Sequence, residues 1–130
     1  MPHLSFEYSP GVERLVDLPA FAAALRDAMV ESGLFPLGGI RVRGHRADVV
    51  VMADGGAHDF IDMAVRLGAG RSAEAKRGAS EAIYAAAEAF LKPAIGGRPF
   101  ALSLEMREID PDLSIKRWNT VHAALSGDKP

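Results

Sequence analysis

The chain contains two strand–helix–strand patterns in series, and this order constrains its fold more than any other feature. Hydrophobic and polar residues alternate over residues 3–8, as in a strand with one buried face. Asp17 can cap a helix whose hydrophobic residues recur at helical spacing until Gly33. A strand is predicted at 40–43, and the apolar run 49–52 is predicted as a second strand piece that needs cover on both faces. The apolar stripe of the helix comprises Leu18, Phe21, Ala22, Leu25, Ala28 and Met29.

The second half of the chain repeats this order of elements, though not the residues themselves. Residues 60–67 are predicted as a strand and 68–71 as a tight connection. Ser72 can cap the long helix that follows, and Pro93 is expected to end it. A final strand is predicted at 100–106, where apolar and polar residues largely alternate again. The expected stripe of the long helix is Ala75, Ala79, Ala82, Ile83, Ala86 and Phe90.

This order predicts an α+β fold made of two tandem βαβ units, each with parallel strands and a right-handed crossover. We expect one domain over 1–130, with halves at about 1–56 and 57–110 and a tail at 111–130. Two helices can cover only one face of a four-stranded sheet. The other face, including part of the valine run, is therefore predicted to meet another copy of the chain. Residues 113–119 alternate weakly and could form an edge strand that reaches a neighbour.

Composition limits the classes of function. Fifteen basic and seventeen acidic residues give a formal net charge of −2, which offers no attraction to nucleic acid or to an anionic membrane. The chain has no apolar run of the length of a membrane span and no signal-peptide pattern. It has no cysteine, which excludes disulfides, thiolate metal sites and thiol nucleophiles. The expectation is a cytoplasmic protein.

The second residue carries chemistry of its own. Initiator methionine is normally removed before a small residue, and its removal would leave Pro2 as a free secondary amine at the start of a strand. Burial disfavours the charged form of an amine and lowers its pKa from the usual value of about 7.7–8.0. Such an amine is a base at neutral pH. The alternative interpretation is that proline at this position merely permits removal of the methionine.

The connection Gly68–Ala73 matches the G-x-G-x-x-A pattern of dinucleotide-binding folds. The chain lacks the neighbouring unit that a dinucleotide site requires, so we set this hypothesis aside. Instead, the connection would place Arg71 at a helix N-terminus, where backbone donors and a guanidinium favour an anion. The alternative is an exposed Arg71 paired with Glu74.

Other candidate residues give weaker signals. Arg41 and Arg43 lie two apart on one strand face and form either a second carboxylate clamp or an exposed polar face. Phe35 and Trp118 would line an apolar pocket or pack in a core or interface. The four histidines show no metal-binding spacing; they are His3, His45, His58 and His122.

Several short segments, taken in chain order, form a recognisable set. They are Pro2-His3 with Glu7, Phe35-Pro36-Leu37, Gly39-Ile40-Arg41 with Arg43, Met52-Ala53-Asp54-Gly55, Gly68-Ala69-Gly70-Arg71-Ser72, Leu102-Ser103 with Glu105, Lys116, and Val121-His122. Together they resemble the tautomerase superfamily and, within it, the 5-carboxymethyl-2-hydroxymuconate isomerase family. The resemblance covers nearly the whole chain. It departs at residues 44–47, which lack an expected bulky aromatic residue, and at Arg117-Trp118, which replace more polar residues.

The resemblance implies a cofactor-free, metal-free isomerase of aromatic-acid degradation, in the homoprotocatechuate route, assembled as a homotrimer. It would ketonise a 2-hydroxymuconate-type dienol with two or three carboxylates. Pro2 and Arg71 would be the catalytic residues, and Arg41, Arg71 and Phe35 would bind the substrate. Two alternatives are open. One is a hydratase, dehalogenase or decarboxylase of the same superfamily, and the other is a trimeric binding protein without catalysis.

Overall fold

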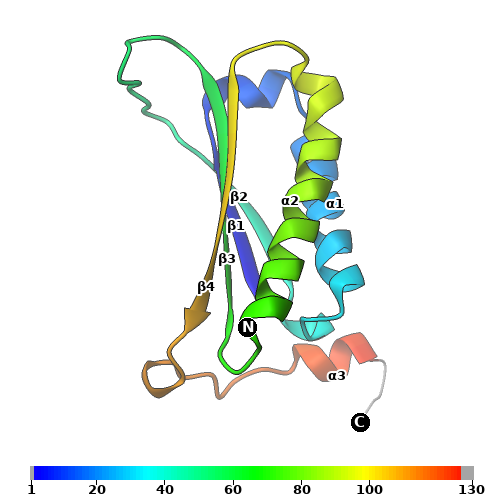
Figure 1. The fold of residues 1–130 in the computed structure, drawn as a ribbon. Coiled ribbons are helices and arrows are strands. Elements are labelled where there is room, and N and C mark those ends of the chain that lie inside the picture. The colour runs from blue at the N-terminus through cyan, green and yellow to red at the C-terminus, as the bar shows by residue number, and fades with distance from the viewer. Residues whose placement is uncertain (1, 127–130) are drawn as a thin grey trace.

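A four-stranded sheet forms the frame of the molecule (Figure 1). The computed structural model describes residues 2–126. The strand order is β2-β1-β3-β4, and β1 pairs in parallel with β2 and antiparallel with β3, while β3 pairs in parallel with β4. The two predicted βαβ units are therefore confirmed. The strands are β1 (His3–Tyr8), β2 (Arg41–Arg46), β3 (Asp59–Gly68) and β4 (Phe100–Ile109).

Two long helices cover one face of this sheet, as predicted (Figure 1). Helix α1 (Leu18–Ser32) begins where the Asp17 carboxylate accepts a hydrogen bond from the amide of Ala20, and it ends at Gly33 with φ of 70°. Helix α2 (Ala73–Ile95) is capped by Ser72. The short helices are η1 (Pro10–Arg14), η2 (Leu37–Gly39), η3 (Pro111–Leu113) and α3 (Val121–Ser126).

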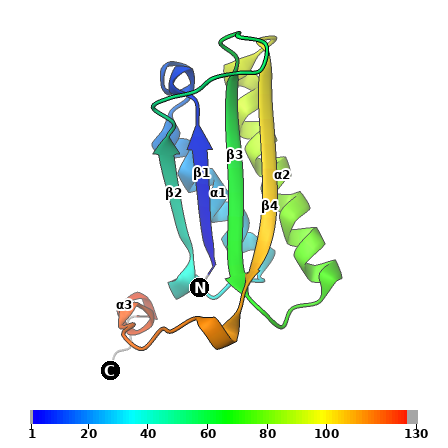
Figure 2. The ribbon, with the colours of Figure 1, turned by 90° about the vertical axis from the view of Figure 1, so that its left-hand side faces the viewer.

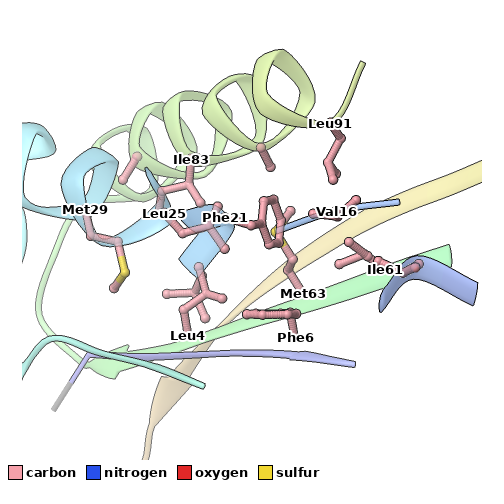
Figure 3. Close-up of a cluster of buried hydrophobic side chains, with 14 of the residues drawn as sticks. Leu4, Phe6, Val16, Phe21, Leu25, Met29, Ile61, Met63, Ile83 and Leu91 are labelled. Atoms are coloured by element: carbon pink, nitrogen blue, oxygen red, sulfur yellow. The ribbon is translucent and has the colours of Figure 1, made fainter. Parts of the chain in front are cut away.

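The core lies between the helices and the sheet (Figure 3). Phe6 of β1 meets Phe21 of α1 edge-to-face, with ring centroids 5.2 Å apart. Alternate residues of β3 point into the same core and are fully buried, among them Ile61 and Met63. This packing fixes the position of β1, and with it the start of the chain, between β2 and β3.

The structure corrects two predictions for α2. Its buried residues are Ala79, Ile83, Ala87, Leu91 and Ile95, so the stripe follows a spacing of four, and the predicted members Ala75 and Ala82 are exposed. The helix also continues past Pro93 to Ile95. A proline so close to the helix end removes one backbone hydrogen bond, and the Gly96 amide still closes the helix on the carbonyl of Lys92.

The apolar run 49–52 is not a strand, and that prediction was wrong. Val49 and Val51 are 84% and 88% exposed in a loop. The reason is topological. Strand β2 already extends to Arg46 beside β1, and the chain must then cross from β2 to β3 on the far side of β1 (Figure 2). Residues 47–58 form that crossing.

The uncovered sheet face is polar, which corrects the expectation of an apolar strand surface there. Exposed apolar side chains gather instead in loop 47–58 and in the tail, where Leu113, Ile115 and Trp118 are largely exposed. The tail forms no strand within the described chain, and its last four residues lie outside the described part, as does Met1. No helix among residues 2–126 is long and apolar enough to cross a membrane.

Candidate active site at the start of the central strand

The start of β1, the end of β3 and the loop before β2 lie at one end of the molecule (Figure 2). Pro2 is buried there, directly before β1. Its carbonyl accepts a hydrogen bond of 3.2 Å from the backbone amide of Arg41. Pro2 therefore has a fixed position beside β2. The removal of Met1, on which the role of Pro2 depends, concerns a residue outside the described part of the chain.

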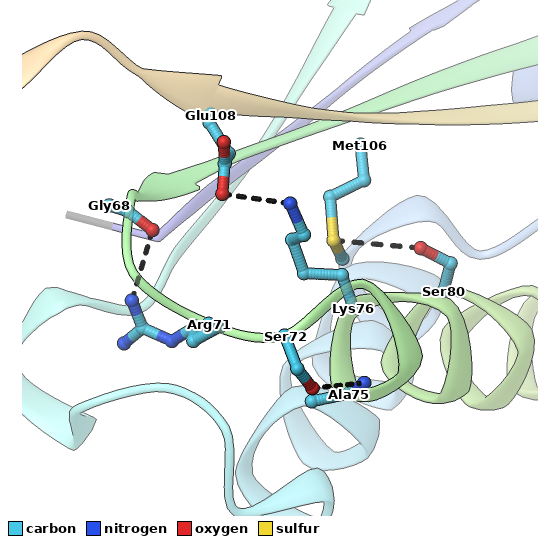
Figure 4. Close-up of polar contacts among 8 residues, drawn as sticks. All are labelled: Gly68, Arg71, Ser72, Ala75, Lys76, Ser80, Met106 and Glu108. Atoms are coloured by element: carbon cyan, nitrogen blue, oxygen red, sulfur yellow. Dashed lines mark hydrogen bonds and ion pairs between the residues drawn. The ribbon is translucent and has the colours of Figure 1, made fainter.

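Arg71 lies in the turn between β3 and α2 and is half-buried (Figure 4). Gly70 shapes this turn with φ of 110°, a conformation that other residues rarely adopt. The guanidinium donates to the carbonyl of Leu34 at 3.1 Å and to the carbonyl of Gly68 at 3.1 Å. It forms no ion pair with Glu74 within residues 2–126, so the pairing considered from the sequence does not occur.

Loop 34–40 is held between two arginines. Arg71 binds the carbonyl of Leu34, and Arg41 donates to the carbonyl of Gly38 at 2.9 Å. Phe35 anchors the same loop in the core, where it is only 8% exposed. Neither guanidinium contacts a carboxylate in the described residues. Two cations without acidic partners thus lie at the end of the molecule where Pro2 is buried.

A row of basic side chains crosses the uncovered face at this same end. The strand register places Arg41 beside His3, His3 beside Arg66, and Arg66 beside Arg107. Arg107 is paired with Glu105, whereas Arg66 has no acidic partner among the described residues. We call these four side chains the basic row.

His3 has an unusual environment in this row. Its Nδ1 lies 3.3 Å from the guanidinium of Arg43, which also donates to Ser5 Oγ at 3.2 Å. Because a guanidinium is only a donor, Nδ1 acts as acceptor and the ring proton resides on Nε2. Nε2 is buried and has no hydrogen-bond partner within residues 2–126. Burial, followed by the charges of Arg43, Arg66 and Arg41, lowers the pKa of His3.

The remaining candidates lie away from Pro2 or have structural contacts. His58 binds Asp54 in the turn of loop 47–58, with 2.8 Å between Nε2 and Oδ2. His122 of α3 packs on Gly38, where a Cβ would collide with the imidazole ring. Trp118 is 92% exposed and belongs to no core in the described chain. No group of three or more His, Asp or Glu residues suitable for a metal ion occurs in the part of the chain that the structure describes.

A family model for 5-carboxymethyl-2-hydroxymuconate isomerase matches residues 2–125. The chain belongs to this family. The 5-carboxymethyl-2-hydroxymuconate Delta-isomerase of Escherichia coli is 38% identical over 125 residues, which are 95% of this chain and 98% of that protein. The predicted family and its isomerase class are therefore confirmed.

Solved structures agree with membership in the isomerase family. A crystal structure of a 5-carboxymethyl-2-hydroxymuconate delta-isomerase superposes with a TM-score of 0.90 at 29% identity, covering 100% of this chain and 96% of that one. The crystal structure of a 5-carboxymethyl-2-hydroxymuconate isomerase from Deinococcus radiodurans R1 gives a TM-score of 0.86 at 28% identity, covering 95% of this chain and 93% of that one. A fused 4-OT symmetric trimer shares the fold alone, at 20% identity and a TM-score of 0.68 over 93% of this chain and 98% of that one.

Sequence analysis missed part of this site. His3 and Arg66 come from strands about sixty residues apart, and only the antiparallel register of β1 and β3 brings them together. The alternation of each strand placed the side chains on a face, but it did not indicate which residues lie opposite one another. The sequence could not indicate the contact between Leu34 and Arg71, because Leu34 makes it through its backbone carbonyl, which every residue has.

Proposed function

We propose that this chain ketonises a 2-hydroxymuconate-type dienol acid of the 5-carboxymethyl-2-hydroxymuconate class, with the Pro2 amine as proton shuttle. The observation that carries the proposal is the placement of Arg41 and Arg71. Both are fixed by loop carbonyls at the end of the molecule where Pro2 is buried, and neither has a carboxylate partner among residues 2–126. A substrate with two carboxylates would supply those partners.

The reaction moves one proton and shifts the conjugated double bonds. After removal of Met1, the neutral Pro2 nitrogen takes the proton of the 2-hydroxyl group, and the electron pair of that O–H bond forms the carbonyl. The double bonds shift along the chain, and the protonated amine returns its proton to a carbon further along. A proton shuttle of this kind works best when its pKa is near the working pH.

The surroundings of Pro2 favour the neutral amine. Pro2 is buried, and the two guanidiniums at this end of the molecule disfavour a further positive charge. We therefore expect an amine pKa below the usual value of about 7.7–8.0. The same two cations would hold the substrate carboxylates and stabilise the negative charge that develops on the dienolate oxygen. The buried ring of Phe35 anchors loop 34–40, which carries a carbonyl partner of each guanidinium.

The proposed setting is the cytoplasmic degradation of aromatic acids in the homoprotocatechuate route, without a cofactor. The family and the relatives that bear the isomerase name support the part of this proposal that concerns the reaction. We also propose a homotrimer. Support comes from the symmetric trimer that shares the fold, and from the exposed valines of loop 47–58 together with the exposed apolar residues of the tail.

The test compares protein with and without a free proline amine. Expression that removes Met1, checked by mass spectrometry, should give kcat/KM that rises with pH through one ionisation below the usual amine value. A sample that retains Met1 should be folded and inactive, because its Pro2 nitrogen is an amide. Pro2→Ala keeps an amine but makes it primary and more mobile, so we expect a large but incomplete loss.

Full turnover with Met1 verified in place would overturn the shuttle. A binding protein would show no turnover with either sample and no titration. A hydratase, dehalogenase or decarboxylase would consume the dienol and yield a product other than the unsaturated 2-oxo acid, which NMR of the reaction mixture distinguishes.

A further inference from the structure

An open hollow of about 450 Å³ adjoins the site but has no role in the reaction described so far. It lies between the end of β3, the end of β4 and the tail after η3, and its lining includes Arg66, Ile109, Ser114, Ile115 and Lys116. Gly68 connects it to the site, because Gly68 lines the hollow and its carbonyl accepts a hydrogen bond from Arg71.

The lining of the hollow carries positive charge. Arg66 and Lys116 both line it, no acidic side chain does, and neither cation forms an ion pair within residues 2–126. The acids nearest in sequence are Glu108, Asp110 and Asp112, and none of them lines the hollow. Glu108 binds Lys76 at 2.8 Å, and the Asp110 carboxylate accepts a hydrogen bond from the Asp112 amide (Figure 4 shows the first pair). The hollow is therefore suited to an anion.

The basic row supplies a second indication. His3 does not line the hollow, but it lies directly opposite Arg66 in the sheet register, and its Nε2–H donor is buried without an acceptor in the described chain. A buried donor without a partner is uncommon in proteins. An anionic oxygen beside Arg66 would provide acceptors on this side of the sheet.

The apolar part of the lining narrows the kind of anion. Ile109, Pro111 and Ile115 give the hollow a hydrocarbon wall beside its two cations, and Ser114 adds a hydroxyl group. This combination suits a carboxylate borne on a methylene group. A bare inorganic anion would leave the apolar wall without a contact.

We propose that this hollow binds a third carboxylate of the substrate, with Arg66 and Lys116 as the residues that determine specificity for a tricarboxylate over a dicarboxylate dienol. The proposal rests on the proposed function for the identity of the other two carboxylates, which Arg41 and Arg71 would hold. Arg66 offers a planar pair of donors for a carboxylate, and Lys116 adds a compact charge.

The test compares two dienols in four variants. Arg66→Met and Lys116→Met should each raise KM for 5-carboxymethyl-2-hydroxymuconate about tenfold or more, the usual weight of a charge-assisted hydrogen bond. The value of kcat should change little, and kcat/KM for 2-hydroxymuconate should stay within about twofold. Lys92→Met removes an exposed lysine from the far end of α2 and should leave KM and kcat/KM for both dienols unchanged. Arg66→Lys should restore part of the lost affinity.

The proposal would be overturned if Arg66→Met and Lys116→Met lowered kcat/KM equally for both dienols. It would also be overturned if neither variant changed the ratio of kcat/KM between the two dienols. A binding measurement decides the matter even if the protein turns over neither dienol. By calorimetry, propane-1,2,3-tricarboxylate should bind the wild type more tightly than glutarate does, and Lys116→Met should remove that difference. Equal binding of the two acids to the wild type, or an unaltered difference in the variant, would contradict the assignment of the hollow whatever the catalytic result.

Discussion

Arg71 organises a loop in the structure, and we propose that it also binds the substrate. Its guanidinium fastens the Leu34 and Gly68 carbonyls, which joins loop 34–40 to the end of β3. A guanidinium carries five N–H donors, so these two bonds leave further donors for a substrate carboxylate. The sequence indicated an anion site here from the turn and the helix start. It could not indicate that the same side chain also organises the neighbouring loop.

Replacement of Arg71 tests this assignment. Arg71→Ala should raise the barrier by about 2–4 kcal/mol, because it removes a charge-assisted contact to the developing dienolate oxygen. That corresponds to a loss in kcat/KM of roughly 30- to 1000-fold. Arg71→Lys should recover only part, since an ammonium cannot form the planar pair of bonds. Arg77→Ala, an exposed arginine in the early part of α2, serves as the control.

Steady-state kinetics with a dicarboxylate dienol gives the measurement. A change of less than about twofold in Arg71→Ala would remove Arg71 from the site. An equal loss in Arg77→Ala would attribute the effect to the helix as a whole.

At the scale of elements, periodicity located most of the strands and helices but not their neighbours. The first strand, both long helices and the two parallel pairings follow from alternation, capping residues and crossover handedness. The run 49–52 has the composition of a buried strand and is a loop, because strand order decides where the chain must cross. The pairing of β1 with β3 spans half the chain, and nothing local encodes it.

The free energy of unfolding is expected to depend on pH through the basic row, because His3 of β1 lies near arginines on both neighbouring strands. The pKa of His3 is lowered in the fold, by burial first and then by Arg43, Arg66 and Arg41. The unfolded chain therefore takes up a proton at a higher pH than the folded chain. Stability should be greatest above the unfolded value of about 6.5 and should fall as the pH drops below it.

Urea unfolding of wild type and His3→Asn at pH 7.5 and 5.5 measures this effect. An asparagine oxygen can still accept from Arg43, so the variant should lose less stability between the two pH values than the wild type. The matched control is His45→Asn on β2, an exposed position, which should behave as the wild type. The same loss in wild type and His3→Asn would exclude His3 as the source.

At the scale of the whole molecule, the distribution of polar and apolar surface indicates where copies of the chain would meet. The uncovered sheet face is polar, while most of the exposed large apolar side chains belong to loop 47–58 and to the tail. These two segments lie beyond opposite ends of the sheet (Figure 1). Sequence analysis anticipated contact with other copies but assigned it to the strands. The structure assigns the apolar surface to irregular segments, whose exposure no periodicity reveals.

Assembly can be tested on the valine loop. The protein should sediment as a trimer at micromolar concentration, and Val51→Lys should weaken that trimer, because Val51 is 88% exposed and a buried lysine would lack a partner. Val30→Lys changes an exposed valine on α1 and should leave the trimer intact. A stable folded monomer of the wild type in sedimentation equilibrium would contradict the proposal.

The central position of β1 also has a consequence for synthesis on the ribosome. The first strand to emerge has both of its partners later in the chain, β2 at residues 41–46 and β3 at residues 59–68. The edge of β1 that pairs with β2 therefore stays open until Arg46 has been translated, and the edge that pairs with β3 stays open until about half of the protein has been made. Open edges invite pairing with other chains. Native pairing must close long loops, which slows folding. We expect nascent chains shorter than about seventy residues to depend on chaperones to keep this strand from aggregating.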